Sequence, residues 1–320
     1  MKKIISTLAS ILLILSTLIG CNSSSKEDQV ATKIGVLKGP TAMGMIKLMD
    51  DKDKYDITIS GSVDEVTPKI VNGEYDICAI PANLSSVLYN NTEGDVVVLA
   101  INTLGVLYIV ENGNTINSIN DLKGKTIYVS GKGATPEYSL NYLLKANNID
   151  PEKDVNIEFK SEHSECLQAV MENENGIAML PEPFVTTAKQ KSDKLRVAID
   201  MNKEWENLQG DNGGLITGVV ICRRDFLKEH PEKIKEFLKD YNESVDFVKN
   251  NNDEAAKLIG EKDIVSENVA KIAIPNCNIT YLDGDEMKNK LEGYLKILYN
   301  QNPKAIGGNL PNEDFYYSSK

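Results

Sequence analysis

Residues 33–60, KIGVLKGPTAMGMIKLMDDKDKYDITIS, decide the fold of this chain. Apolar and β-branched residues predict strands over 33–37 and 55–60, and the segment between them predicts a helix over 42–50. The alternation then continues with a helix over 63–72, a strand over 76–80, a helix over 82–89 and a strand over 96–101. Strands that alternate with helices at this spacing are typical of a doubly wound parallel sheet.

A second unit of the same kind begins after Gly113. No sequence period links the two units, so we expect similar folds rather than a repeat. The sequence therefore predicts an α/β protein with two lobes. The elements expected in the second unit are a helical turn over 118–123, strands over 126–130, 156–159 and 176–180, and helices over 136–147 and 164–174.

Two stretches are suited to carry the chain between the lobes. Residues 102–110 and 213–222 are rich in strand-forming residues, and Gly213 and Gly214 give the second stretch backbone freedom. We expect paired crossover strands here. Two amphipathic helices, over 231–250 and 285–299, are expected to pack back onto the first lobe. The predicted division is lobe I over 30–107 and 217–320, and lobe II over 108–216.

The N-terminus has the features of an export signal. Lys2 and Lys3 precede an apolar run over 4–19 that is too short for a stable membrane span. Cys21 directly follows Leu18-Ile19-Gly20, which resembles the lipobox of bacterial lipoproteins, where this thiol is lipidated. We expect a signal peptide over 1–20 and a polar, lipidated linker over 21–29. The alternative is a chance cysteine at the end of an ordinary leader.

Composition and charge exclude several classes of function. Loss of the leader removes Lys2 and Lys3 and takes the net charge from −12 to −14, which argues against a nucleic-acid partner. Beyond the leader, no stretch is long enough to cross a bilayer. The cysteines lack zinc-site spacing, so we expect no metal, and we expect no cofactor. Cys78 and Cys222 lie in strand-like segments and are expected in the core. Disulfide pairing stays open for Cys78, Cys166, Cys222 and Cys277.

Several short motifs, taken in order, resemble those of the solute-binding lipoproteins of ABC importers. They are the lipobox, residues 33–40 (KIGVLKGP), 72–77 (NGEYDI), 121–125 (DLKGK), 181–183 (PEP), 230–232 (HPE), 306–311 (IGGNLP) and 315–317 (FYY). Within that group the chain is most similar to the nitrate, sulfonate and taurine class, which includes binders of thiamine-precursor pyrimidines. The resemblance implies a type II periplasmic-binding-protein fold, in which two doubly wound lobes joined by two crossover strands clamp a ligand.

The loops that follow the strands form the candidate site, because in open parallel sheets they meet the amino ends of the next helices at one crevice. Their hydroxyls, amides and glycines suit hydrogen bonding to a small anion or a polar heterocycle. Caps and turns are the competing explanation for each residue taken alone. The candidate ligand-binding residues are Thr41, Ser60, Ser62, Asn83, Asn102, Thr103, Thr135, Tyr138, Ser161, His163 and Glu182.

Three of these candidates have alternative roles. His163 follows a predicted strand and could donate to a ligand or lie in solvent at a helix start. Tyr138 and Trp205 could form an apolar wall for an aromatic ligand or pack in the core. Glu182 could accept a hydrogen bond from a ligand amine or form a structural salt bridge.

One nucleotide-binding motif is incomplete. The segment 131–136, GKGATP, has Pro136 where a dinucleotide-binding loop needs its third glycine. We therefore expect Gly131 and Gly133 only to bring backbone donors near the ligand, and Pro136 to begin a helix.

These features together predict a capture protein. It is expected to close on a small polar or anionic organic solute of the sulfonate, taurine or nitrate kind, and to deliver it to a permease and its ATPase. We expect a monomer, lipid-anchored outside the cytoplasm, and no enzyme, because the sequence has two histidines and no recognisable nucleophile with a nearby base. The alternatives are a binder of a pyrimidine or other heterocyclic vitamin precursor, an enzyme on the same two-lobed fold, and a sensor or adhesion module.

Overall fold

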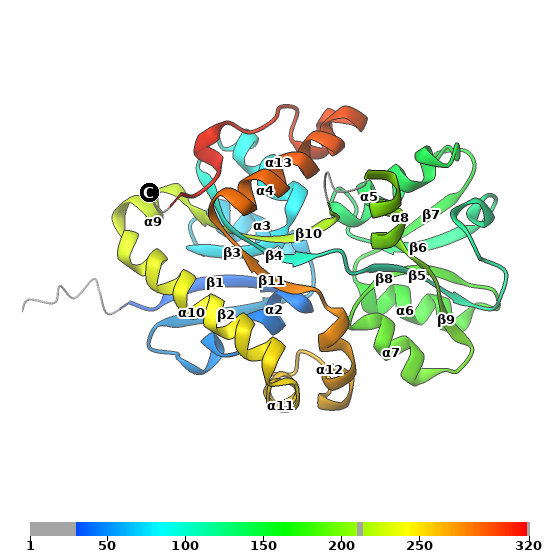
Figure 1. Cartoon of the computed structure of the whole chain (residues 1–320), viewed down its shortest axis with the longest axis horizontal. Helices are drawn as coiled ribbons and strands as arrows, with labels where there is room; N and C mark the ends of the chain where they lie inside the picture. The colour runs from blue at the N-terminus through cyan, green and yellow to red at the C-terminus, as the bar shows by residue number, and fades with distance from the viewer. Residues whose placement is uncertain (1–29, 210–213, 319–320) are drawn as a thin grey trace, which may run out of the picture.

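The computed structural model describes residues 30–209 and 214–318, which form two β-sheets with helices packed around them (Figure 1). The predicted signal peptide, Cys21 and the linker lie outside these residues. In the described ranges, no helix has the length and hydropathy needed to cross a membrane. The α/β architecture with two sheets, expected from the sequence, is confirmed. The division of the chain at 107/108 and 216/217 stays a prediction.

The first sheet has six strands in the order β11-β4-β10-β3-β1-β2. β1 pairs in parallel with β2 and β3, as expected where helices link the strands. β10 lies antiparallel between β3 and β4, and β11 is antiparallel to β4. The strands are β1 (Thr32–Leu37), β2 (Tyr55–Ser60), β3 (Ile77–Pro81), β4 (Val96–Leu104), β10 (Ile216–Arg223) and β11 (Ile279–Leu282).

The second sheet has five strands in the order β7-β6-β8-β5-β9. β6 is parallel to β7 and β8, whereas β5 is antiparallel to both β8 and β9. The strands predicted within each unit therefore run in one direction, as expected, and the antiparallel pairings are added by the crossover strands and by β9 and β11. In each sheet the strand that arrives from the other sheet, β5 or β10, runs against its neighbours. The strands are β5 (Leu107–Asn112), β6 (Thr126–Ser130), β7 (Asn156–Lys160), β8 (Ile177–Pro181) and β9 (Leu195–Asp200).

The helices cover the faces of both sheets, and the two late amphipathic helices pack on the first sheet as expected. Phe237 and Tyr241 of α10 share a buried cluster with Val36 of β1, and Leu291 of α13 shares one with Val98 of β4. Burying these stripes removes apolar surface from water, the main favourable contribution to folding. The helices are α2 (Pro40–Gly44), α3 (Val63–Val71), α4 (Ala82–Asn91), α5 (Thr135–Ala146), α6 (His163–Glu172), α7 (Phe184–Lys191), α8 (Met201–Gln209), α9 (Arg224–Glu229), α10 (Pro231–Asn250), α11 (Asn252–Glu261), α12 (Glu267–Ala273) and α13 (Gly284–Gln301).

The helix expected over 42–50 is shorter in the structure. α2 ends at Gly44, and a 3₁₀ turn follows over Leu48–Asp50. Residues 42–46 are all fully buried, so the segment is enclosed on every side and has no polar face of the kind that an amphipathic surface helix shows. The expectation that Cys78 and Cys222 lie in the core is confirmed. All four cysteines in the described part of the chain are buried and free.

The connection between the sheets is short. Only Gly105 and Val106 separate β4 from β5, and the returning strand β10 pairs Ile216 with Leu104 and Gly218 with Thr103. The two crossing strands therefore lie hydrogen-bonded side by side, as Figure 1 shows for β4 and β10. A Cβ on Gly218 would lie 2.3 Å from Asn102 Oδ1, so this close approach requires glycine.

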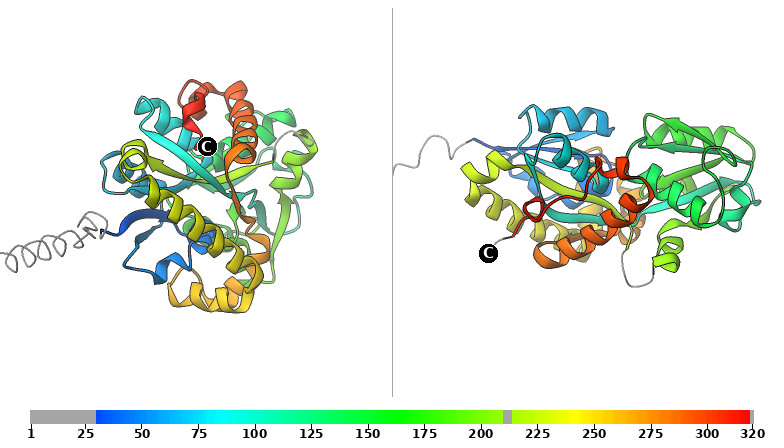
Figure 2. Two further views of the ribbon diagram at one scale, coloured as in Figure 1. Left: turned by 60° about the vertical axis from the view of Figure 1, so that its left-hand side comes forward. Right: turned by 90° about the horizontal axis from the view of Figure 1, so that it is seen from above.

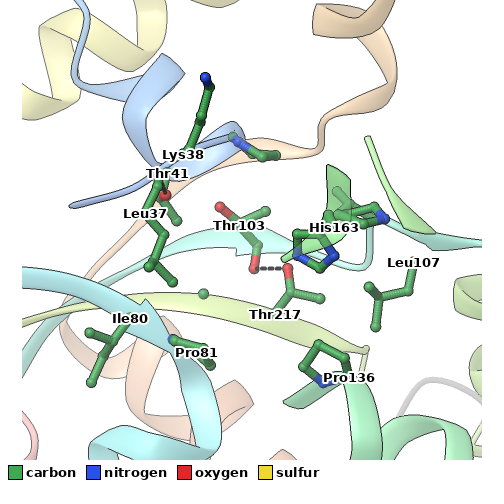
Figure 3. Close-up of a pocket in the computed structure, with 14 residues that line it drawn as sticks. Leu37, Lys38, Thr41, Ile80, Pro81, Thr103, Leu107, Pro136, His163 and Thr217 are labelled. Atoms are coloured by element: carbon green, nitrogen blue, oxygen red, sulfur yellow. Dashed lines mark hydrogen bonds between the residues drawn. The ribbon is translucent and has the colours of Figure 1, made fainter. Parts of the chain in front are cut away.

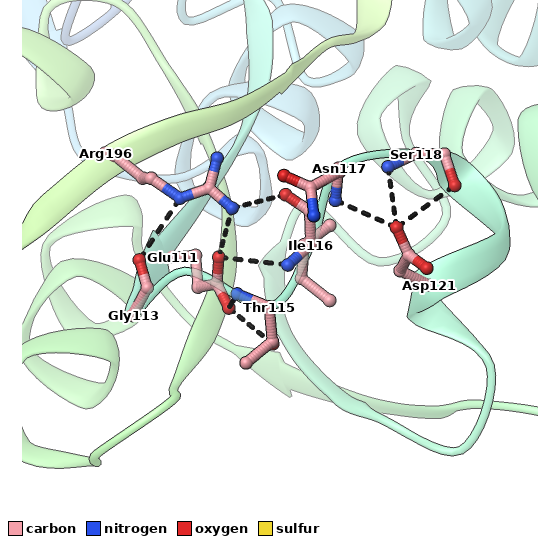
Figure 4. Close-up of polar contacts among 8 residues, drawn as sticks. All are labelled: Glu111, Gly113, Thr115, Ile116, Asn117, Ser118, Asp121 and Arg196. Atoms are coloured by element: carbon pink, nitrogen blue, oxygen red, sulfur yellow. Dashed lines mark hydrogen bonds and ion pairs between the residues drawn. The ribbon is translucent and has the colours of Figure 1, made fainter.

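A buried ion pair stabilises the second sheet (Figure 4). Glu111 of β5 and Arg196 of β9 are cross-strand partners, and the guanidinium lies 2.8 Å from the fully buried carboxylate. Glu111 also accepts hydrogen bonds from the backbone and hydroxyl of Thr115 and from the backbone of Ile116. Burial alone raises the pKa of Glu111, but these hydrogen bonds and the charge of Arg196 outweigh it and hold the pKa below its usual value.

Candidate ligand-binding cleft

Three pockets lie between the sheets, and Lys38 and His163 line all of them. The hinge pocket, of about 100 Å³, lies beside the crossing strands and includes Leu37, Thr41, Pro81, Thr103, Pro136 and Thr217. The lysine pocket, of about 140 Å³, includes Gly61, Ser62, Asp64, Lys132, Lys160 and Ser161. The side pocket, of about 330 Å³, includes Leu167, Phe184, Thr187, Ile264, Val265 and Val269.

The lysine pocket has more lysines than either of the other two pockets. Lys38 comes from the loop after β1, Lys132 from the loop after β6, and Lys160 from the end of β7. Lys160 pairs with Glu158 at 2.6 Å, whereas no carboxylate of the described residues lies within ion-pair distance of Lys38 or Lys132. Two carboxylates, of Asp64 and Glu162, also line the pocket. Three lysines and two carboxylates line this pocket, and Lys160 is already paired with Glu158, so the ammonium groups of Lys38 and Lys132 are the ones left for an anion.

Three helices begin at the lysine pocket without a side-chain cap. The cap positions are Ser62 for α3, Ala134 for α5 and Glu162 for α6, and none of these side chains accepts from a backbone N–H of the first turn. Glu162 accepts instead from the hydroxyl of Ser164. The first N–H groups of a helix have no partner within the helix, and they carry partial positive charge. The pocket therefore combines ammonium groups with uncapped helix starts from both sheets, an arrangement that suits an anion.

Two glutamates fix the loops on the second sheet's side of this pocket. Glu137 of α5 accepts from the backbone N–H of Gly133 at 2.6 Å, and Glu165 of α6 accepts from that of Ser161 at 2.8 Å. The N–H of Gly133, expected to face a ligand, is therefore occupied. On the opposite side, the hydroxyl of Ser62 caps nothing, which leaves it available to a ligand.

The hinge pocket is apolar apart from Lys38, His163 and a few hydroxyls. Pro40, Pro81, Pro136 and Pro181 form much of its wall. Thr103 is 2% exposed, and its hydroxyl has no hydrogen-bond partner. A buried hydroxyl without a partner is costly, because it has lost its bonds to water. Figure 3 shows Thr103 and Thr217 between Leu37 and His163, so the unpaired hydroxyl lies where a bound molecule would meet it.

His163 is the half-buried first residue of α6. Its Nδ1 lies 2.5 Å from the hydroxyl of Ser130, at the end of the neighbouring strand β6. Desolvation lowers the pKa of His163 to about 4, so the imidazole is neutral near pH 7. When Ser130 donates to Nδ1, the neutral ring carries its proton on Nε2 and acts there as an uncharged donor.

Five of the eleven residues predicted from sequence line these pockets. The remaining six do not, and their binding roles stay predictions. Those along the pockets are Thr41, Ser62, Thr103, Ser161 and His163; those elsewhere are Ser60, Asn83, Asn102, Thr135, Tyr138 and Glu182.

Asn83 and Thr135 instead hold the two halves of the molecule together. The Thr135 hydroxyl donates to Asn83 Oδ1 at 3.2 Å, and Asn83 Nδ2 donates to the carbonyls of Gly133 and Ala305. Both side chains are fully buried. Their polar groups therefore bond helix α4 on the first sheet to the start of α5 on the second.

The four other residues have partners or surroundings away from the pockets. Tyr138 lines a separate polar cavity with Glu152 and Asn302. Glu182 accepts from the backbone and hydroxyl of Thr186 in α7, and burial, its largest influence, raises its pKa. The Ser60 carbonyl accepts from the backbone of Lys38. Asn102 is fully buried beside Gly218, with neither amide atom bonded.

Trp205 also lies outside the pockets and forms no ligand wall. It is fully buried in α8, with its ring centroid 4.6 Å from that of Tyr142 and 5.6 Å from that of Tyr294 in α13. Since α8 belongs to the second sheet and α13 packs on the first, this aromatic group is part of the contact between the two halves.

Sequence reasoning did not single out the three lysines. Lys132 and Lys160 lie in loops that follow predicted strands, and Lys38 directly follows the first strand, so their positions were a usable signal. The prediction considered only neutral hydrogen-bond donors, so it left these three lysines out. Within 30–209 and 214–318, no group of three or more histidine, cysteine, aspartate or glutamate side chains could hold a metal ion.

Comparisons with known proteins give one family. Residues 52–264 match the model of a family described as ABC transporter, phosphonate, periplasmic substrate-binding protein. No curated protein matches the chain.

Solved structures show the same fold at low sequence identity. An ABC transporter from Parabacteroides distasonis is similar, with 23% identity, a TM-score of 0.74, and coverage of 91% of this chain and 99% of that one. The periplasmic aliphatic sulphonate binding protein SsuA from Escherichia coli is similar with 13% identity, a TM-score of 0.71, and coverage of 90% and 92%. The alkanesulfonate-binding protein SsuA from Xanthomonas axonopodis pv. citri, bound to MOPS, has 13% identity, a TM-score of 0.68, and coverage of 88% and 94%.

Proposed function

Because the chain belongs to the phosphonate-type periplasmic substrate-binding proteins of ABC transporters, we propose that it captures a small organic anion, a phosphonate or sulfonate, in the lysine pocket. It then presents this solute to a permease and its ATPase. Members of this family are binding proteins of transporters. The proposed activity is therefore the capture and delivery of a solute, without the breaking of a bond. The structural neighbours named for sulphonate binding share the fold and support this class of ligand.

One observation carries the proposal: both sheets direct positive groups into the same pocket. Lys38 and the start of α3 come from the first sheet, and Lys132, Lys160 and the starts of α5 and α6 come from the second. A phosphonate or sulfonate group has three oxygens that accept hydrogen bonds from such donors. The neutral ring of His163 and the free hydroxyl of Ser62 add uncharged donors beside the lysines.

Contacts from both sides explain why binding would favour a closed protein. A ligand shifts a conformational equilibrium only by its differential affinity for the two states. An anion that touches Lys38 on one side and Lys160 on the other loses half of its partners when the sheets separate. Micromolar affinity corresponds to about −8 kcal/mol, which several charge-assisted hydrogen bonds can supply.

The site of action follows from the same family. We propose that Cys21 carries lipid after removal of residues 1–20, that the linker over 21–29 tethers the protein outside the cytoplasm, and that the protein acts as a monomer. Globomycin, which blocks the signal peptidase of lipoproteins, should leave the precursor uncut. The Cys21→Ser variant should be lost from the membrane fraction.

Calorimetry with matched ligands tests the binding proposal. Butylphosphonate and butanesulfonate are compared with the uncharged dimethyl ester of butylphosphonate. We expect at least one anion to bind, and its neutral ester to bind at least tenfold more weakly. Equal affinity for the anion and the ester would refute an anion site. A pyrimidine that binds while both anions fail would favour the heterocyclic hypothesis instead.

A further inference from the structure

The side pocket has more large apolar side chains than the lysine pocket that it adjoins, beside the charged side chains of Lys38, Lys191 and Glu162. Leu167 of α6 and Phe184 of α7 form one wall, and the opposite wall is formed by Ile264 and Val265, in the loop between α11 and α12, and by Val269 of α12. The two walls come from elements that pack on different sheets. A cavity of about 330 Å³ remains between them, against about 100 Å³ at the hinge. It has room for about ten groups of the size of water, where the hinge pocket has room for about three.

The two pockets adjoin each other, because Lys38, Gly61, Glu162 and His163 line both of them. A Cβ on Gly61 would lie 2.7 Å from Glu162 Oε1, so the exposed side chain of Glu162 lies against Gly61 between the pockets. A molecule whose charged end lies among the lysines reaches the side pocket when this side chain rotates away. α7 and α12 contact each other beside this cavity, so its apolar walls face each other from the two halves of the molecule.

From this geometry we infer that the solute carries an extended apolar tail, and that the side pocket is the site that binds the tail. The inference rests on the proposed function, since the lysine pocket must hold the anionic head. The head supplies charge recognition, and the tail supplies affinity by removing apolar surface from water. A bare oxyanion, or a head with a tail of one or two carbons, leaves the side pocket unfilled and binds weakly.

A series of n-alkylphosphonates measures the tail separately from the head. Methyl-, butyl- and octylphosphonate share one charged group and differ only in methylenes. Full burial of a methylene corresponds to about a fourfold gain in affinity, so we expect a gain of about two- to fourfold per added methylene from butyl to octyl. The hinge pocket has room for only a short chain, so binding of the tail there would end the gain near butyl.

A variant that fills the side pocket tests where the tail lies. Thr187 lines the pocket from α7 and is half-buried. Thr187→Trp should leave methylphosphonate binding within twofold of wild type and should abolish the gain from butyl to octyl. Gln190→Trp is the matched control, because Gln190 is exposed on the same helix and lines none of the three pockets. Ser266→Trp fills the pocket from the opposite wall and serves if Thr187→Trp fails to fold.

The outcomes separate the two proposals. The tail site is supported if affinity rises with tail length in the wild type and in Gln190→Trp, and if both pocket-filling variants remove this rise. Equal affinity for all three phosphonates, or a length dependence that survives in the filled variants, overturns the tail site while the anion site stands. No binding of any phosphonate or of the matching sulfonates overturns both.

Discussion

Replacement of Lys38 by glutamine should weaken binding of butylphosphonate about five- to thirtyfold while leaving the fold intact. Lys38 lines all three pockets and has no ion-pair partner among the described residues, so its charge is available to a ligand. Glutamine keeps a polar side chain of similar reach and removes only the charge. The loss should therefore appear in affinity rather than in stability.

The magnitude follows from the setting of the ammonium group. Two unit charges 4 Å apart interact by about 4 kcal/mol at an effective dielectric constant of 20, and by about 1 kcal/mol in bulk water. Lys38 is an exposed residue at the mouth of the cleft, so the lower half of that range applies. A loss of about 1–2 kcal/mol corresponds to the stated change, at about 1.4 kcal/mol for each factor of ten.

Calorimetry at two salt concentrations provides the assay. Wild-type affinity should fall more steeply than that of Lys38→Gln between 0.01 and 0.1 M salt, because the Debye length shrinks from about 30 Å to about 10 Å. Lys52→Gln is the matched control. Lys52 is exposed just before β2, whose far end lies at the lysine pocket, so about 20 Å of strand separates it from the cleft. Equal affinities for Lys38→Gln, Lys52→Gln and wild type would refute the electrostatic account.

Three further changes have defined outcomes. Thr103→Val removes a buried hydroxyl that has no partner, so thermal unfolding should show unchanged or slightly higher stability, whereas ligand affinity should fall if the hydroxyl meets the ligand. Asn83→Ala removes the bonds to Gly133 and Ala305 and should cost about 2 kcal/mol in urea unfolding, with an increased radius of gyration in solution scattering. Glu111→Ala leaves Arg196 unpaired and should cost about 3 kcal/mol at pH 7. Because folding lowers the pKa of Glu111, its ionised carboxylate stabilises the folded protein fully above the usual pKa of 4.5. This stabilisation is lost as the pH falls through the pKa of the folded state. The Glu111→Ala variant should therefore lack this part of the pH dependence of the unfolding free energy.

The sequence predicts local elements well where periodicity alone determines them. The stripe of apolar residues over 231–250 predicted α10 with the bounds that the structure shows, because one buried face repeats at the helical period. The same signal failed over 42–50, where residues 42–46 are all buried and show no contrast between faces. The direction of β10 was also beyond the local pattern, since the strands on its two sides are distant in sequence.

The site was predictable as a set of loops but not residue by residue. Strand ends correctly indicated where Ser62, Thr103 and His163 would line the pockets. Asn83 also follows the end of a strand, yet its amide donates a hydrogen bond to the carbonyl of Ala305, 222 positions away. A partner that distant leaves no mark in the neighbouring residues, so the rule could not separate a ligand contact from a structural one.

The paired crossing strands β4 and β10 also have a mechanical consequence. If the two halves rotate apart, the β4–β10 pairing at Thr103 and Gly218 acts as the hinge axis. Each group then moves in proportion to its distance from that axis. The two halves lie side by side in the right-hand view of Figure 2. The hinge pocket lies against the hinge axis and would barely change shape, whereas α7 and α12 lie farther from β4 and β10 (Figure 1), so the gap between them would widen more. Contacts made there would be lost at a smaller opening angle than contacts near the hinge axis, so a tail that touches both sides would add to the differential affinity for the closed state.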